Sequence, residues 1–291
     1  MGLLGSFKRM MAGSKVDIRA RFELLREAVS GTMSSFYMAR DKENDRIVGL
    51  KLLDLKKTAE FEGRFKGLKK PTEGEVTAAI SHPRIVKLYE HGITTRDEQY
   101  LVLEFVEGQG MNSILVAKSP LLDGRRVALL RHAAEALAAV HKAEFLHRDI
   151  CPRNFIVAPD GESLKLIDFG LSVPFTPPFM QPGNRTGNPN YMAPELVKRM
   201  STDQRIDVFA LGVTAYELCT FEMPWSRGLK GDVAMAHANK PPAPITKYRP
   251  QINDKLAKAI SSCLEQDRAK RCATAEQFLR SIQGIGHEDE P

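Results

Sequence analysis

The sequence predicts an α+β protein with two lobes, a small lobe rich in strands followed by a larger lobe that is mostly helical. Between residues 22 and 105, short runs of β-branched and aromatic residues alternate with polar turns. From residue 110 onward, apolar residues recur at the spacing of a helical face. The 291 residues suffice for one large domain or two modest ones.

Four segments of the small lobe are predicted to be strands, because they are rich in residues that favour a pleated, half-buried surface. They are residues 22–25, 36–40, 47–53 and 100–105. One main helix is expected between them, at residues 71–80, where Pro71 suits a first helical turn. The connection to the larger lobe is expected at residues 104–110.

Four segments of the large lobe are predicted to be helices. They are residues 125–141, 207–219, 255–263 and 275–282. In the first of them, Val127, Leu130, Ala134 and Leu137 form an apolar stripe. The polar tail, residues 287–291, is expected to be solvated.

The composition, with 43% hydrophobic and 27% charged residues, is typical of a soluble globular protein. No apolar run approaches the roughly 18 residues that a membrane-spanning helix requires. The four cysteines form no CxxC pair, so neither a disulfide framework nor a zinc site is predicted. A reducing cytoplasm is therefore the expected location.

The net charge of +6 is modest, although basic residues gather at Lys56–Lys57 and between Lys66 and Lys70. We interpret these residues as a solvated helix face and expect no nucleic-acid partner. A patch for nucleic acid or for an acidic membrane is the alternative.

Residues 1–20 are set apart as an N-terminal extension. Met1-Gly2-Leu3-Leu4-Gly5-Ser6 matches the pattern for N-terminal myristoylation. Leu3, Leu4, Phe7, Met10 and Met11 also fit one helical face. Such a face either docks on the domain or lies on a membrane surface, so a weak membrane contact through this extension is left open.

Five short motifs follow one another in an order that chance does not readily produce. They are Val48-Gly49-Leu50-Lys51, His82-Pro83, His147-Arg148-Asp149-Ile150-Cys151-Pro152-Arg153-Asn154, Asp168-Phe169-Gly170 and Ala193-Pro194-Glu195. They contain what phosphoryl transfer requires: a cation for the phosphates, oxygen ligands for metal ions and a carboxylate that orients the nucleophile.

With these motifs, residues 22–283 resemble the eukaryotic-type protein kinase superfamily, most closely its Ser/Thr branch, which includes bacterial members. The resemblance implies the bilobal protein kinase fold, with a small antiparallel β-sheet lobe that carries one main helix and a larger, mostly α-helical lobe. It divides the chain into an extension (1–20), a kinase domain (21–284) and a tail (285–291). Within the domain it implies an N-lobe (21–105), a hinge (104–110) and a C-lobe (110–284).

The resemblance also implies a phosphate-gripping ion pair. Lys51 is expected to bind the α/β-phosphates of ATP, held extended by a glutamate on the following helix. In the family that glutamate stands about nine residues before the histidine of the His-Pro motif, which gives Glu73, with Glu75 as the alternative.

Three further residues are expected to act on the transferred phosphate. Asp149 would orient the substrate hydroxyl and accept its proton, and Asn154 and Asp168 would hold Mg²⁺. At the hinge, backbone groups of Glu104 and Val106 would bind adenine, and Leu103 would close the rear of the pocket.

Other matches concern structure. Asp207 resembles the aspartate that anchors the backbone of the catalytic loop, and Phe209 stands where the family usually has tryptophan. Glu195 is expected to form a buried ion pair with Arg271.

The sequence departs from the family at the loop that covers the phosphates. The pattern G-x-G-x-x-G-x-V aligns with Val29 to Phe36, so that Val29 and Gly31 are expected to contact the nucleotide. Only Gly31 survives of the three glycines, and glycine allows backbone to approach phosphate closely. Weak nucleotide binding is therefore expected.

Two more departures lie near the catalytic aspartate. Cys151 stands where Ser/Thr kinases have lysine, and Asn188 replaces the threonine that contacts this lysine. Arg153 is the expected substitute for the lysine, because a guanidinium binds phosphate well. Beside a phosphate site, Cys151 is expected to be partly exposed and reactive.

The chain is thus predicted to be a Mg²⁺-dependent kinase that transfers the γ-phosphate of ATP to Ser/Thr hydroxyls of proteins. A pseudokinase that acts as a nucleotide-binding or scaffolding module is the alternative, and a small-molecule phosphotransferase is a third class. An activating phosphate, if the kinase uses one, is expected on Thr186, paired with Arg148.

Overall fold

The computed structural model describes residues 15–30, 33–183, 186–225 and 230–289. The chain divides into two compact units, one formed by residues 1–81 and 86–106 and the other by residues 82–85 and 107–291. The boundary at residue 106 falls within the expected connection, but the sequence did not predict that residues 82–85 belong to the second unit. The myristoylation pattern and the apolar positions after it lie outside the described residues.

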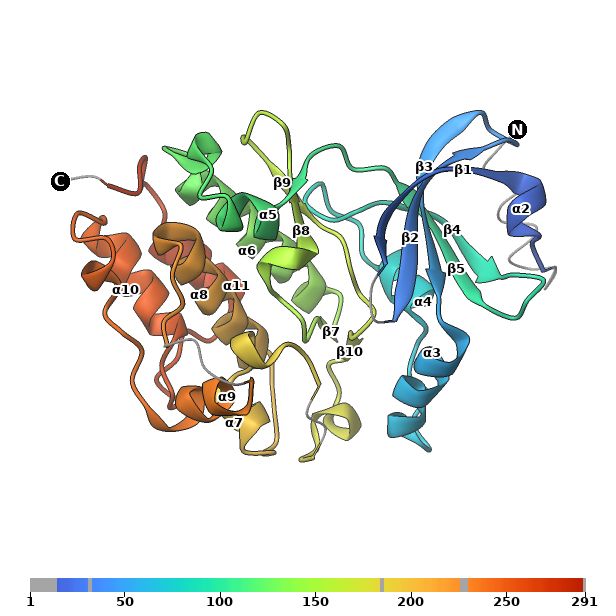
Figure 1. The fold of residues 1–291 in the computed structure, drawn as a ribbon. Coiled ribbons are helices and arrows are strands. Elements are labelled where there is room, and N and C mark those ends of the chain that lie inside the picture. Colours follow the sequence, from blue (N-terminus) through green and yellow to red (C-terminus); the bar gives the residue numbers. More distant parts are fainter. Residues whose placement is uncertain (1–14, 31–32, 184–185, 226–229, 290–291) are drawn as a thin grey trace. The chain divides into compact units, whose positions relative to one another are not determined.

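In its described residues, the first unit holds an antiparallel sheet and short helices (Figure 1). Its elements are α2 Ile18–Arg21, β1 Phe22–Ser30, β2 Ser34–Asp41, β3 Arg46–Leu53, α3 Leu55–Glu62, α4 Glu73–Ala79, β4 Leu88–Ile93 and β5 Gln99–Glu104. The strand order is β1-β2-β3-β5-β4.

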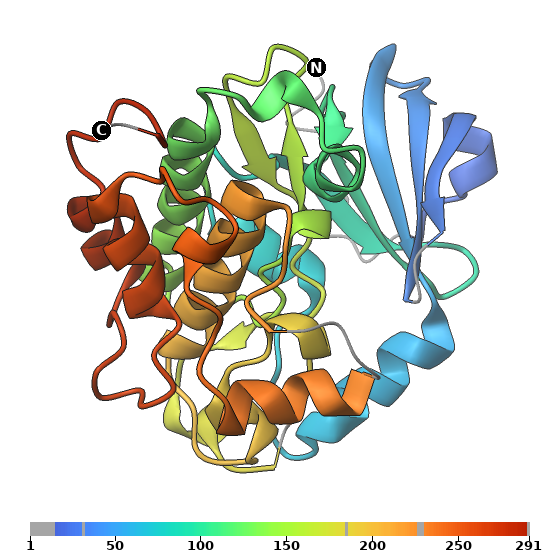
Figure 2. The same cartoon turned by 60° about the vertical axis from the view of Figure 1, so that its left-hand side comes forward.

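The second unit is mostly helical, so the predicted α+β architecture is confirmed. Its elements are β6 Gln109–Gly110, α5 Met111–Val116, α6 Arg126–Lys142, β7 Phe145–Leu146, β8 Phe155–Val157, β9 Leu164–Leu166, β10 Val173–Pro174, α7 Pro194–Val197, α8 Arg205–Thr220, α9 Lys230–Asn239, α10 Asp254–Cys263 and α11 Ala275–Ser281. α10 packs on α8, and α11 packs on α6 (Figure 2). None of the described helices combines the length and the apolar character needed to cross a bilayer.

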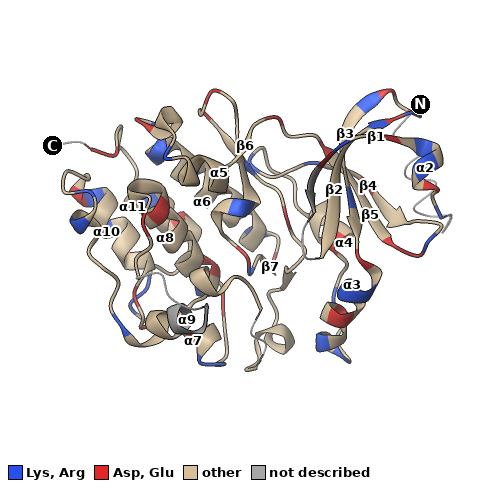
Figure 3. Ribbon diagram, in the orientation of Figure 1, with Lys and Arg blue, Asp and Glu red and all other residues tan. Residues whose placement is uncertain are grey.

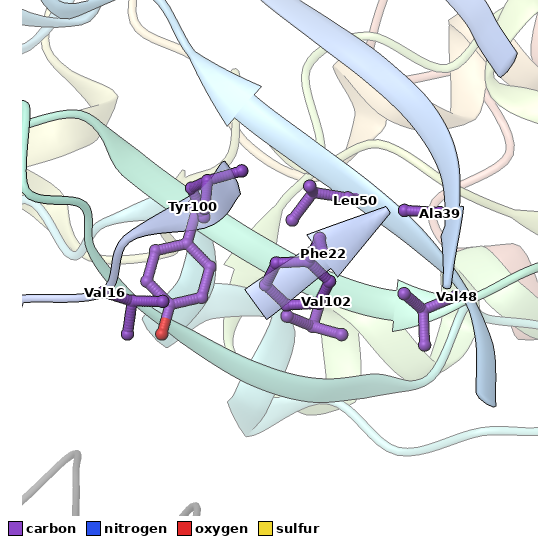
Figure 4. Packing of buried hydrophobic residues seen from close by; sticks show 8 residues of the cluster. Val16, Phe22, Ala39, Val48, Leu50, Tyr100 and Val102 are labelled. Carbon is purple, nitrogen blue, oxygen red and sulfur yellow. The ribbon is translucent and has the colours of Figure 1, made fainter. Parts of the chain in front are cut away.

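One face of the sheet is covered by the start of the described chain. Val16, Ile18 and Phe22 pack on alternate residues of the strands and complete a buried cluster (Figure 4). The strand residues of this cluster are Ala39, Val48, Leu50, Tyr100 and Val102. Residues 15–22 therefore form part of the first unit, and the opposite face of the sheet carries the alternate positions.

Polar contacts fasten this segment to the sheet edge. The Val16 N–H donates to the Ile93 carbonyl (3.0 Å), and Val16 accepts from the Thr95 N–H (3.0 Å). Arg21 is buried between two carboxylates, with its guanidinium 2.9 Å from Asp41 and 2.6 Å from Glu90.

The main helix of the first unit begins later than predicted. α4 starts at Glu73 and Thr72 is its N-cap, so Pro71 precedes the helix and does not occupy its first turn. Thr72 and Glu75 form a reciprocal capping box, which satisfies backbone N–H groups that a helix start leaves unpaired. A glycine, Gly74, then lets α4 approach β4, because a Cβ there would lie 2.5 Å from the His91 ring.

The helix α3 was not predicted. Its N-cap Asp54 accepts a hydrogen bond from the Lys57 N–H (2.9 Å). Lys56 and Lys57 are exposed on α3, which also carries acidic residues (Figure 3). The exposed lysines agree with the interpretation as a solvated helix face.

The expectation of a solvated C-terminal tail is wrong for Glu288. Its side chain is fully buried, and its carboxylate lies 2.7 Å from the guanidinium of the buried Arg126. The next residue, Asp289, pairs with Arg249. The Glu288 side chain, unlike that of the exposed His287, is buried together with the Arg126 guanidinium that compensates its charge.

Candidate active site

The first unit contains the predicted lysine–glutamate pair. Lys51 lies on β3, and its Nζ is 2.6 Å from Oε1 of Glu73, the first residue of α4. Both side chains are buried. Glu75, the alternative, instead accepts from the Thr72 N–H (2.7 Å) in the capping box. Lys51 is thus held extended by Glu73.

The second unit holds Asp149 in a loop between β7 and β8. The Asn154 amide Nδ2 donates to the Asp149 carboxylate (3.0 Å) and to its main-chain carbonyl (2.6 Å). Burial raises the pKa of Asp149, while the hydrogen bond from Asn154 and the nearby His147 oppose that rise. The contacts fix the direction of the carboxylate, which is what an orienting group requires.

Asp207, on α8, anchors this loop from beneath. Its carboxylate accepts from the main-chain N–H groups of His147 (2.8 Å) and Arg148 (2.8 Å). A third contact, at 3.0 Å, comes from Nε2 of His141. Burial alone would raise the pKa of Asp207, but the hydrogen bond from His141 and the other contacts hold the pKa below its ordinary value. Arg148 adopts a positive φ of 68°, so the loop is bent sharply at the anchored residue.

Asp168 follows β9 and lies close in the backbone to Asn154. The Ile167 N–H donates to the Asn154 carbonyl (3.0 Å), and the Gly170 N–H donates to Oδ1 of Asp168 (2.8 Å). The Asn154 amide uses Nδ2 toward Asp149, so its Oδ1 is the atom suited to bind a cation. Carboxylate and amide oxygens suit Mg²⁺.

Among the described residues, no group of three or more His, Cys, Asp or Glu side chains gathers as a metal site. The oxygen atoms of Asn154 and Asp168 fit a Mg²⁺ ion that would take its remaining ligands from phosphates and water, as Mg²⁺ commonly does.

The expectation that Cys151 is exposed is wrong. Its side chain is fully buried, and burial raises the pKa of its thiol to about 12. Arg153 is exposed, and its charge lies near Cys151, Asp149 and Tyr191. The Arg153 side chain is therefore at the surface, whereas the Cys151 thiol is in the interior.

The predicted hinge residues lie at the end of β5. Leu103 is buried. The Glu104 N–H donates to the Lys87 carbonyl (2.9 Å), and the Glu104 carboxylate accepts from the Lys87 N–H (2.8 Å). Val106 is the last residue of the first unit.

The phosphate-covering loop is described only in part. Val29 of β1 pairs with Phe36 of β2. The first and last residues of the aligned motif therefore stand opposite each other in the sheet. Gly31 lies outside the described residues.

The segment before α7 approaches the catalytic loop closely. Gly187 has a φ of +123°, and a Cβ there would lie 2.7 Å from the Arg148 carbonyl, so only glycine fits. Asn188 caps its own turn by accepting from the Asn190 N–H (3.2 Å). A cavity lies between this segment and the loop, lined among others by Asp149, Tyr191 and Met192.

Thr186 is buried in this structure, as is Ser172, whereas Thr176 is exposed. A phosphate on Thr186 would require this segment to open first. Of these three hydroxyls, Thr176 is the accessible one.

Two sets of contacts, made by Glu195 and by the Met192 carbonyl, fix the segment around the start of α7. Glu195 binds Arg271 through two hydrogen bonds, of 2.6 and 3.0 Å, so the predicted ion pair is present. His237 on α9 contacts the Met192 carbonyl through Nδ1 (2.8 Å). Its ring lies 4.2 Å from that of Trp225 and 5.6 Å from that of Phe209. No motif singles out His237, so this contact was not predicted.

A family model described as "Protein kinase domain" matches residues 22–281. The chain is 31% identical over 283 residues to serine/threonine-protein kinase pkn2 of Myxococcus xanthus, covering 94% of this chain and 33% of that protein. It is 27% identical over 276 residues to serine/threonine-protein kinase PrkC of Bacillus subtilis, covering 94% of this chain and 41% of that protein.

It is also 28% identical over 277 residues to serine/threonine-protein kinase PknA of Mycobacterium tuberculosis, covering 93% of this chain and 62% of that protein. The chain therefore spans between a third and somewhat under two thirds of the length of these relatives.

Proposed function

The chain belongs to the protein kinase family, and on that premise we propose that it transfers the γ-phosphate of ATP to Ser/Thr hydroxyls of proteins. The observation that carries the proposal is the fixed Asp149 carboxylate, hydrogen-bonded by Asn154 in a loop anchored by Asp207. A protein that only bound nucleotide would not need this carboxylate to be oriented. The relatives named above are all serine/threonine-protein kinases by name, which supports the same substrate class.

The roles follow from the chemistry of each group. Lys51, held by Glu73, binds the α/β-phosphates of ATP. Asp149 orients the substrate hydroxyl and accepts its proton, and Arg153 binds the γ-phosphate. Mg²⁺ held by Asn154 and Asp168 would neutralise charge on the phosphates.

The adenine base is assigned to the hinge, where backbone groups of Glu104 and Val106 bind its polar edge and Leu103 lies behind it. The partners are protein substrates, and the cytoplasm is the proposed location. A pseudokinase remains the second candidate, because Cys151 and Asn188 depart from the family and the phosphate-covering loop has lost two glycines.

The test is incubation with radiolabelled ATP, Mg²⁺ and a generic basic protein, with Asp168→Ala as the control. Wild type should label Ser or Thr of the substrate, and the control should not, since it lacks a metal ligand. Nucleotide binding without labelling by wild type would favour the pseudokinase.

A further inference from the structure

Residues 54–70, which join β3 to α4, form a basic module of the first unit (Figure 3). They contain six basic and three acidic residues, so this short stretch carries half of the net charge of +6 that belongs to the whole chain. The basic residues are Lys56, Lys57, Arg64, Lys66, Lys69 and Lys70. None of them belongs to the motifs of the candidate active site.

Two phenylalanines hold the module together. The rings of Phe61, on α3, and Phe65 are both buried and lie 5.5 Å apart, edge to face. The chain then turns back. The Leu68 N–H donates to the Phe65 carbonyl (2.9 Å), and Nζ of Lys70 lies 5.3 Å from the centre of the Phe61 ring. The lysines on both sides of this turn therefore belong to one folded body.

The stability of the module does not explain where its lysines stand. Lys56 and Lys57 lie in the first turn of α3, where the helix dipole disfavours positive charge. In the part of the chain that the structure describes, these two residues and Lys66 and Lys69 are exposed and form no ion pair. Exposure alone would fit a solvated face, but solvation gives no reason for cations at the unfavourable end of a helix.

Two leucines are exposed in the same module. Leu55, the first residue of α3, is 52% exposed, and Leu68, in the turn, is 36% exposed. Aliphatic side chains that stand among lysines are typical of segments that lie on a bilayer, where the apolar groups enter the interface and the cations meet the headgroups.

The kinds of side chain distinguish a bilayer from other anionic partners. Five of the six cations are lysines, which act on phosphate as point charges, whereas specific phosphopeptide sites favour the planar fork of arginine. Single-stranded nucleic acids stack their bases on exposed aromatic rings. Both rings of the module, Phe61 and Phe65, are buried. The module therefore fits a diffuse anionic surface better than a phosphopeptide or a nucleic acid.

The module lies next to the point where the N-terminal extension joins the first unit. Glu62, the last residue of α3, accepts a hydrogen bond from the Gln99 amide (3.3 Å), and Lys15 pairs with Asp97. Both contacts are made at the connection between β4 and β5. A membrane contact through the extension, which the sequence leaves open, would therefore act beside the module, and two weak contacts bind more firmly than one.

We propose that the basic module, residues 54–70, binds the surface of a bilayer that contains anionic phospholipids, with its lysines against the headgroups and Leu55 and Leu68 in the interface. The inference goes beyond the proposed function and does not rest on it, because it requires neither nucleotide binding nor phosphate transfer.

The test measures binding of the full chain to sucrose-loaded vesicles by co-sedimentation. The vesicles consist of phosphatidylcholine alone or of phosphatidylcholine with about 30% phosphatidylserine. The charge variant is Lys66→Gln with Lys69→Gln. The matched control, Lys258→Gln with Lys270→Gln, removes the same charge at two exposed lysines of the second unit. The thermal midpoint of each protein checks that it is folded.

Wild type should bind only the vesicles with phosphatidylserine, and about 0.5 M salt should release it because salt screens the attraction. Lys66→Gln with Lys69→Gln should weaken this binding about thirtyfold, or by about 2 kcal/mol for the two charges. Leu55→Ser with Leu68→Ser should weaken it about tenfold. The control variant should bind as wild type does.

Equal losses in the charge variant and the control would show that only total charge matters and would overturn the proposal. Failure of wild type to bind either kind of vesicle, or equal binding to both kinds, would overturn it as well. So would tighter binding to a single-stranded oligonucleotide or to polyglutamate than to the vesicles, which would assign the module to a nucleic acid or to an acidic protein.

Discussion

Arg153 is exposed and lies near Asp149, and we propose that its charge substitutes for the lysine that Cys151 replaces. Because charge is redistributed over the equatorial oxygens and the leaving group as the γ-phosphate is transferred, a cation placed for that arrangement should act chiefly on the transition state. Arg153→Ala should therefore lower turnover by about a hundredfold or more and change ATP binding little.

The measurement is steady-state kinetics of wild type and Arg153→Ala, with Cys151→Lys added to the latter. The lysine should restore part of the turnover, because the space beside Cys151 is vacated by the arginine. Wild-type turnover in Arg153→Ala would show that this arginine is only a solvated loop residue.

Cys151 offers a second test at the residue scale. A fully buried thiol whose pKa is raised to about 12 has almost no thiolate at neutral pH, and the thiolate is the reactive form. Native protein treated with iodoacetamide at pH 7 should therefore show no label on Cys151 by mass spectrometry, with or without MgATP. Unfolded protein, as the control, should label fully; rapid labelling of the native protein would mean that the thiol is exposed.

At the scale of elements, α9 supports the segment that faces Asp149 across the cavity. His237 bonds the Met192 carbonyl, and its own end of α9 is fixed because the Gln266 amide donates to the His237 carbonyl (2.8 Å). His237→Phe keeps an aromatic ring against Trp225 but loses the donor. It should raise KM for the protein substrate about fivefold, the value of one hydrogen bond, and leave KM for ATP unchanged.

His237→Asn should restore KM, since its amide nitrogen can replace Nδ1. His132→Phe is the control, the same substitution at a histidine of α6 in the second unit, which is half-buried where His237 is fully buried. Equal rises of KM for both substrates, or a rise in the control, would contradict a positioning role for His237.

The elements that could be predicted from the sequence are those whose own pattern decides their structure. The helices α6, α8, α10 and α11 lie within two residues of their predicted ends. α6 and α10 have an apolar stripe, whereas α8 is apolar and buried on nearly all sides. The strand β4 was missed, since His91 and Gly92 interrupt its apolar pattern and pairing with β5 makes it a strand. The helix α9 was missed because its own apolar pattern is weak. Its packing against α7 stabilises it as a helix, and that packing cannot be predicted from the local sequence.

The same distinction applies to the site residues, which could be predicted where they stand in a motif. Lys51, Asp149, Asn154 and Asp168 stand in motifs of fixed spacing, so their neighbours could be named in advance. Contacts between distant residues carry no such pattern. Glu288 is 162 positions away from Arg126 in the chain, and nothing in its sequence context indicates burial.

At the scale of the whole molecule, the charge of Asp207 links stability to pH. Its pKa in the folded protein is held below the ordinary value of 3.8, chiefly by the hydrogen bond from His141 acting against burial. A depressed pKa contributes stability that is complete above the ordinary value and is lost as the pH falls through the folded value. This contribution should therefore disappear only below about pH 4.

Asp207→Asn should lower the free energy of unfolding at pH 7 by about 3–5 kcal/mol, the usual effect of removing one partner from a buried charged set. The measurement is denaturant unfolding of both proteins at several pH values. The difference between them should shrink below pH 4. A constant difference down to pH 2 would mean that the charge of Asp207 does not stabilise the folded state.

We propose that Asp149 is an oriented catalytic carboxylate, which distinguishes an active kinase from a binding module. Asp149→Asn keeps the shape of the side chain and removes its charge, while Lys51, Asn154 and Asp168 remain to bind the nucleotide. The most direct measurement is single-turnover transfer from radiolabelled ATP, with MgATP binding measured on the same samples. Asp149→Asn should bind MgATP as wild type does and should lose transfer by about a hundredfold or more. Transfer by Asp149→Asn at the wild-type rate would contradict the catalytic role of this carboxylate.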